Sequence, residues 1–110
     1  FSGLLYVLTA GIHVPNPSEL LSSGTFKEYM KVLKQNFDFI IIDCAPIGSI
    51  SDAIPVGNAV DGTIFVVSAK DTKRKDAAQC VDLLKRSNVN VIGSVLTKAD
   101  SGSGSYHYYY

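Results

Sequence analysis

The sequence lacks the features that mark several classes of protein. Its 110 residues include ten basic and ten acidic side chains, so the formal net charge is zero. The charge excess that draws a protein to nucleic acid is therefore missing. No run of about 18 apolar residues is present, so we expect no segment that spans a membrane. The two cysteines, Cys44 and Cys80, have no metal-ligand spacing and no disulfide rhythm, so we interpret them as reduced thiols of a cytosolic protein.

A starting methionine and a signal peptide are also lacking, because the chain begins at Phe1. This start predicts a fragment whose N-terminal part is absent. The length is that of one small domain or of a piece of a larger one. Hydrophobic residues make up 46% of the composition, which is enough to build a core, so general disorder is not expected.

Short apolar runs alternate with amphipathic patterns through the first hundred residues. The runs that predict strands lie at 4–8, 39–42, 64–67 and 89–96. The patterns that predict helices begin after a cap at Asn16, after a cap at Thr25, near Asp52, and after a cap at Asp71 or Thr72. This alternation predicts an α/β fold in which helices flank a mostly parallel sheet in three layers.

The composition changes after Asp100. Residues 101–105 alternate serine with glycine and predict a flexible tether, and residues 106–110 contain four tyrosines. An exposed, mobile phenol can enter an active site as a phosphate acceptor. A sticky disordered end or a scar left by cloning would have the same composition. We therefore divide the chain into a domain over 1–100 and a tail over 101–110.

Asp43 is the first candidate for chemistry. It follows the uninterrupted run at 39–42, which is typical of a strand buried on both faces of a parallel sheet. Ligands of open α/β sheets bind at the carboxyl ends of the strands. A carboxylate at that edge can hold Mg²⁺, which neutralises nucleotide phosphates. An aspartate that only caps the following turn would give the same pattern.

The residues around Asp43 resemble the Walker-B region of the bacterial tyrosine kinases of capsule and exopolysaccharide synthesis. Residues 43–48 read D-C-A-P-I-G and residues 51–53 read S-D-A, with Ala45 in the place of a proline in that family. Further matching segments are L-T-A-G at 8–11, P-N-P-S-E-L-L at 15–21, V-D-G-T-I at 60–64 and V-I-G-S-V-L at 91–96. The resemblance covers nearly the whole chain.

This resemblance implies the C-terminal half of a P-loop-type kinase domain, with ATP and Mg²⁺ as cofactors and Asp43 as the catalytic and metal-binding residue. The phosphate acceptors would be Tyr106, Tyr108, Tyr109 and Tyr110. The family further implies a homo-oligomeric ring at the inner face of the cell membrane. A transmembrane activator of the polysaccharide co-polymerase type would hold the ring there, and a cognate tyrosine phosphatase would reverse the reaction.

Two motifs of that family are missing. No G-x-x-x-x-G-K-[ST] loop occurs, and neither does a strand followed by D-x-D. Without the loop and its lysine little holds the phosphates, so we expect the chain alone to bind ATP weakly or not at all. Thr97 stands where related ATPases often carry an asparagine that faces the base, which makes Thr97 and Lys98 the candidate nucleotide-binding pair.

Two other interpretations remain open. A switch ATPase of the partitioning or septum-site type explains the sheet and Asp43 but gives no reason for the tyrosines. A non-catalytic partner protein, phosphorylated on its tail by another kinase, is the second. Truncation after Asp100 tests the first, because a switch ATPase would keep its output. Phosphotyrosine that survives Asp43→Asn would support the second.

Overall fold

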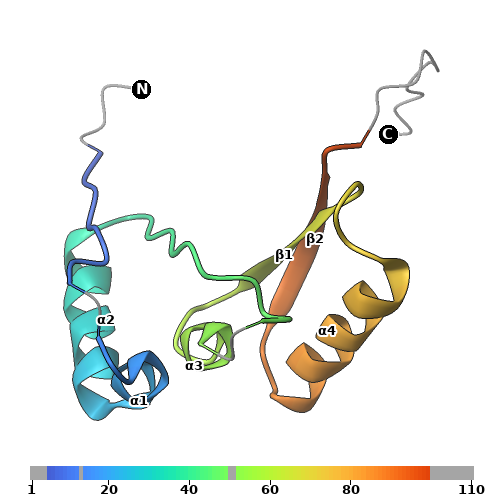
Figure 1. Ribbon diagram of the computed structural model, residues 1–110. Coiled ribbons are helices and arrows are strands. Elements are labelled where there is room, and N and C mark those ends of the chain that lie inside the picture. Colours follow the sequence, from blue (N-terminus) through green and yellow to red (C-terminus); the bar gives the residue numbers. More distant parts are fainter. Residues whose placement is uncertain (1–4, 13, 50–51, 100–110) are drawn as a thin grey trace.

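The computed structural model describes residues 5–12, 14–49 and 52–99. Its elements, in chain order, are α1 (Pro17–Ser22), α2 (Gly24–Asn36), α3 (Ala53–Gly57), β1 (Thr63–Ser68), α4 (Arg74–Arg86) and β2 (Val91–Thr97). In Figure 1, α1 and α2 lie together at one end of the molecule, β1, β2 and α4 lie at the other, and α3 lies between them. The mixture of helices and strands confirms the α/β class.

The two strands confirm the prediction of parallel pairing. β1 pairs with β2, with Val66 opposite Val95 and Ser68 opposite Thr97. The helix α4 connects them, as parallel neighbours require a crossover. Because the strands run in the same direction, Ser68 and Thr97 end at one edge of the sheet.

The buried positions are few, and one contact among them joins α3 to the turn into β2. The buried apolar side chains within the described ranges are Met30, Val56, Leu84 and Val89. Asn88, with φ of 57°, ends α4 in the left-handed region, and Val89 follows it. A Cβ on Gly57 would lie 2.8 Å from Val89 Cγ1. A side chain at position 57 would therefore force Val89 to shift.

The helix starts differ from the prediction at two places. Ser23 caps α2, and its Oγ accepts a hydrogen bond from the Phe26 N–H at 3.2 Å. The predicted cap, Thr25, was wrong by two residues and lies in the first turn. At α4 the N-cap residue is Lys73, which makes no side-chain cap. Asp71 and Thr72 were therefore both wrong as caps. The Asp71 carboxylate is instead held at the edge of the sheet by Ser68 and Lys98.

The strands expected at 4–8 and 39–42 are not formed in the described part of the chain. Phe39 and Ile41 are 90% and 94% exposed, whereas Ile40 and Ile42 are half-buried. This alternation has the period of a strand. The prediction failed because a strand also needs a neighbour to pair with its backbone, and segment 39–42 has none within the described ranges.

None of the helices in the described ranges has the length and apolar character that crossing a membrane requires.

Candidate functional site

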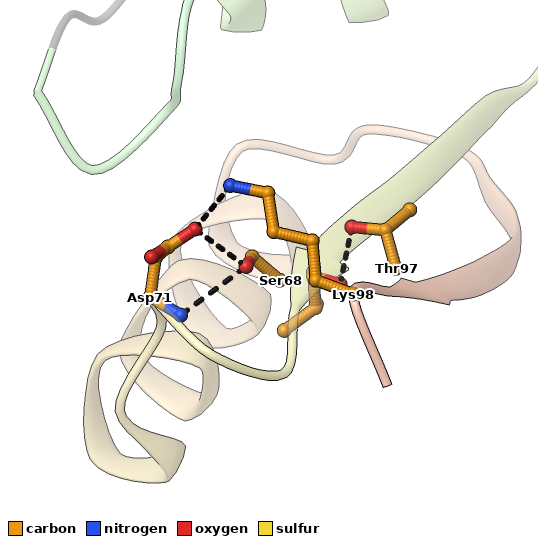
Figure 2. A network of polar contacts seen from close by, with 5 residues as sticks. Ser68, Asp71, Thr97 and Lys98 are labelled. Carbon is orange, nitrogen blue, oxygen red and sulfur yellow. Dashed lines mark hydrogen bonds and ion pairs between the residues drawn. The ribbon is translucent and has the colours of Figure 1, made fainter. Parts of the chain in front are cut away.

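A polar network lies at the carboxyl edge of the sheet, where β1 and β2 end (Figure 2). The Asp71 carboxylate accepts hydrogen bonds from Ser68 Oγ, at 2.8 Å, and from Lys98 Nζ. The Asp71 N–H donates back to Ser68 Oγ at 3.2 Å. The network therefore ties the end of β1 to the residue that follows β2.

Thr97 belongs to the same edge. Its Oγ1 donates to the carbonyl of Val67 at 3.3 Å, and its own carbonyl accepts the Ala69 N–H at 2.8 Å. Lys98 has φ of 54°, a left-handed conformation that turns the chain away after the strand. Thr97 is the last residue of β2 and Lys98 follows it, so both lie where the strand ends.

The charges at this edge shift one titration. The hydrogen bond from Lys98 holds the pKa of Asp71 below its ordinary value, and the bond from Ser68 and the Lys98 charge act in the same direction. Both partners of the ion pair are about three-fifths exposed. An ion pair this exposed contributes little stability, so a ligand that needs the Lys98 ammonium could displace Asp71 at small cost.

Asp43 is exposed and makes no hydrogen bond or ion pair with the described part of the chain. Its negative charge acts on the neighbouring Cys44. Partial burial raises the pKa of the Cys44 thiol, and the negative charges of Asp43 and then Asp52 raise it further. The two carboxylates therefore approach one point from different segments.

Asp52 is a site residue that the sequence analysis did not single out. It immediately precedes α3, and its carboxylate accepts a hydrogen bond from Ser18 Oγ of α1. This bond spans 34 positions in the sequence. The only signal for it was the S-D-A step at 51–53, which pattern analysis alone could not connect to α1.

The donor set near Asp43 fits Mg²⁺ only together with a nucleotide. No group of three or more His, Cys, Asp or Glu side chains gathers to hold a metal within the ranges that the structure describes. Mg²⁺ is usually held by one or two carboxylates, by waters and by substrate phosphates. Asp43, with Asp52 nearby, supplies the one or two carboxylates, and the remaining ligands would be waters and phosphate oxygens.

The structure does not bring all the candidates together. Thr97 and Lys98 share the sheet edge, but no hydrogen bond or ion pair in the described ranges joins them to Asp43. The tether at 101–105 and the four tail tyrosines, Tyr106, Tyr108, Tyr109 and Tyr110, lie outside the described residues.

Comparison with known proteins identifies relatives over almost the full chain. No protein-family model matches. The chain is 36% identical over 106 residues to the putative tyrosine-protein kinase CapB of Staphylococcus aureus, covering 96% of this chain and 46% of the relative. It is also 36% identical over 106 residues to the tyrosine-protein kinase YwqD of Bacillus subtilis, covering 96% and 45%.

Solved structures agree. The VpsO kinase domain superposes with a TM-score of 0.78 at 32% identity, over 84% of this chain and 46% of that one. The kinase domain of the Escherichia coli tyrosine kinase ETK gives a TM-score of 0.74 at 28% identity, over 88% and 38%. The chain thus spans about half the length of the relatives it matches. Over nearly its whole length the chain is therefore similar, in sequence and in fold, to bacterial tyrosine kinases.

Proposed function

We propose that this chain is part of a protein-tyrosine kinase that transfers the γ-phosphoryl group of ATP to tyrosines of its own C-terminal cluster. The observation that carries the proposal is the match of 96% of the chain to tyrosine kinases, together with its superposition on two kinase domains. In this proposal residues 1–100 belong to the kinase domain, and residues 101–110 form the acceptor tail.

Asp43 is the proposed metal-binding and catalytic residue. Its exposed carboxylate can bind Mg²⁺ directly or through a water, and the ion would offset the negative charge of the transferring phosphoryl group. The Asp43 carboxylate can also accept a hydrogen bond from the phenol that attacks. Asp52 adds a second negative charge near Cys44, which strengthens the attraction for a cation. The hydrogen bond that its carboxylate accepts from Ser18 also joins α3 to α1.

Thr97 and Lys98 are the proposed contacts to the nucleotide base. They lie at the carboxyl edge of a parallel sheet, where α/β proteins bind ligands. Their polar atoms are engaged with Val67 and Asp71. Base binding would therefore exchange these exposed contacts for contacts to the ligand, and we expect Thr97→Ala to change the affinity for ATP more than the rate of transfer.

The acceptors we propose are Tyr106, Tyr108, Tyr109 and Tyr110. The tether of five serine and glycine residues spans on average roughly 12 Å, and this reach lets a phenol enter an active site on its own or a neighbouring subunit. By analogy with the family we further propose a homo-oligomeric ring that regulates capsule or exopolysaccharide synthesis. A transmembrane activator would hold it at the inner face of the membrane, and a tyrosine phosphatase would act on the tail.

The test is a chimera in which residues 1–110 replace the matching region of the Bacillus subtilis relative, incubated with Mg²⁺ and γ-labelled ATP. We expect label on tyrosine. Replacement of the four tail tyrosines by phenylalanine should abolish it, whereas Tyr29→Phe, a helix tyrosine of α2, should leave it unchanged. ATP hydrolysis that persists without any tyrosine labelling would instead favour the switch ATPase.

A further inference from the structure

Three consecutive cations stand at the start of α4, and their side chains make no hydrogen bond or ion pair with the described part of the chain. This basic patch consists of Lys73, Arg74 and Lys75, which are all exposed. Of the nearby carboxylates, Asp71 is paired with Lys98, and Asp76 is the acidic residue of the first helical turn. Asp76 offsets one of the three positive charges, so the patch keeps a net positive charge.

The patch lies where the helix itself is positive. Lys73 is the N-cap residue of α4 and makes no side-chain cap, so the first amides of this 13-residue helix are left without one. The positive end of a helix disfavours cations and attracts anions. The three cations therefore cost stability where they stand, and a bound anion would make the same arrangement favourable. Residue choices that oppose local physics in this way are expected at functional sites.

The tail starts beside the patch. Lys98, the residue after β2, reaches across to Asp71 in the loop between β1 and α4, as Figure 2 shows. Lys73 stands two residues after Asp71, and Tyr106 stands eight residues after Lys98. A flexible chain of eight residues spans roughly 16 Å on average and about 28 Å when it is extended. A phosphate on a tail tyrosine can therefore reach the patch of its own chain.

Charge selects the phosphorylated form of the tail. Residues 101–110 contain no aspartate, glutamate, lysine or arginine, so these residues offer the patch no negative side chain before modification. Each phosphotyrosine would add a charge of about −1.5 to −2. Its phosphate oxygens accept strong, charge-assisted hydrogen bonds from arginine and lysine. Clusters that contain arginine recognise phosphorylated segments through this chemistry.

We propose that the basic patch at the start of α4 binds the phosphorylated tail of the same chain, with phosphotyrosine held by the patch side chains and by the uncapped amides of the helix. Binding would withdraw a tail that has already received phosphate from the active site. This consequence, and the presence of phosphate on the tail, rest on the proposed function. The charge of the patch, its position and the reach of the tail do not.

The first experiment measures binding of a synthetic peptide, residues 100–110 with phosphate on Tyr108 and Tyr109, so it needs no kinase activity. The protein is the chimera described above with its four tail tyrosines replaced by phenylalanine, without ATP or Mg²⁺. We expect fluorescence anisotropy to show saturable binding that weakens as salt is added. The unphosphorylated peptide should bind at least about tenfold more weakly. Equal binding of the two peptides would overturn the proposal.

The matched variants are two double substitutions at opposite ends of α4, each of which removes one lysine and one arginine. Lys73→Gln with Arg74→Gln should weaken binding of the phosphopeptide at least about tenfold. Lys85→Gln with Arg86→Gln, in the last turn of the helix, should leave the affinity within about twofold. Removal of cations from a helix N-terminus should not lower thermal stability, and thermal unfolding separates lost binding from lost folding. Equal weakening by the two pairs would reveal attraction to overall charge alone and would overturn the proposal.

A second experiment tests whether the patch is occupied within one chain. A chimera ligated through residues 101–105 to the same phosphorylated segment should bind the free phosphopeptide at least about tenfold more weakly than the phenylalanine form. A short tether gives an effective concentration in the millimolar range, so the attached tail competes. Undiminished binding would contradict docking within the chain.

Two further outcomes separate this proposal from its rivals. Vesicles of anionic phospholipid that bind through the patch, where the phosphopeptide does not, would assign the patch to a membrane surface and overturn the proposal. Phosphopeptide binding by a chimera that labels no tyrosine would support the patch and count against the kinase function alone. Tyrosine labelling without phosphopeptide binding would count against the patch alone.

Discussion

Residues 39–42 and residues 64–67 carry the same kind of apolar run, yet only the second is a strand. Residues 64–67 lie within β1, which pairs with β2 and is followed by α4. Residues 39–42 alternate between exposed and half-buried positions but pair with nothing in the described ranges. The comparison shows that an apolar run sets the pattern of side-chain burial, whereas a ladder also needs a partner backbone close in space.

Shortening a buried side chain next to the paired strands should lower stability, whereas shortening an exposed side chain of the unpaired segment 39–42 should not. Leu84 of α4 is 3% exposed, so Leu84→Ala should lower the free energy of unfolding by about 2–5 kcal/mol. Chemical denaturation followed by circular dichroism measures this loss. Ile41→Ala is the control and should change stability by no more than about 0.5 kcal/mol. Equal losses would show that segment 39–42 is packed in the isolated chain.

The contact between α3 and the turn into β2 gives a smaller effect. In Gly57→Ala the new methyl group would lie 2.8 Å from Val89 Cγ1. Overpacking should cost about 1–3 kcal/mol, offset in part by the better helix propensity of alanine. Gly24→Ala, at a helical glycine with open space around its Cβ, should not destabilise. The added variant Val89→Ala should make Gly57→Ala less costly; additive losses would exclude the contact.

The cap of α2 distinguishes the structure from the sequence-based prediction. Ser23→Ala removes the bond from the Phe26 N–H and should cost about 1 kcal/mol of stability. Thr25→Ala, at the cap predicted from sequence, should cost clearly less. Thermal unfolding of the two variants side by side decides the matter, and the reverse order would restore Thr25 as the cap.

Two kinds of detail could not be predicted from the sequence: the choice between neighbouring caps, and contacts between distant segments. The sequence predicted β1, β2 and the approximate start of all four helices, because each depends on local pattern. It misplaced the α2 cap because Ser23 and Thr25 are both good caps, and Ser23 is favoured since its hydroxyl also donates to Leu20 at 2.6 Å at the end of α1. The Ser18–Asp52 and Lys98–Asp71 contacts join distant segments, so no local pattern encodes them.

The smallest expected effect concerns the region beside Asp43. In a Cys80→Ala background, Asp52→Asn should lower the pKa of the Cys44 thiol toward its ordinary value, since Asp52 raises it. The charge-matched control Asp61→Asn should not. The rate of alkylation against pH measures this pKa. The pKa of this thiol is higher in the folded than in the unfolded protein. The free energy of unfolding should therefore fall as pH rises above the pKa of the unfolded thiol, and it should stop falling above the pKa of the folded one. No response to Asp52→Asn would separate Asp52 from the site.

Phosphoryl transfer in the chimera tests the role of Asp43 most directly. With Mg²⁺ and labelled ATP, Asp43→Asn should reduce tyrosine labelling at least about a hundredfold, because the carboxylate that holds the ion is lost. Asp38→Asn, an exposed aspartate at the other end of segment 39–42, should label as the unchanged chimera does. Tyrosine labelling that survives Asp43→Asn in an otherwise purified protein would contradict the assignment of Asp43 as the metal-binding residue of this kinase.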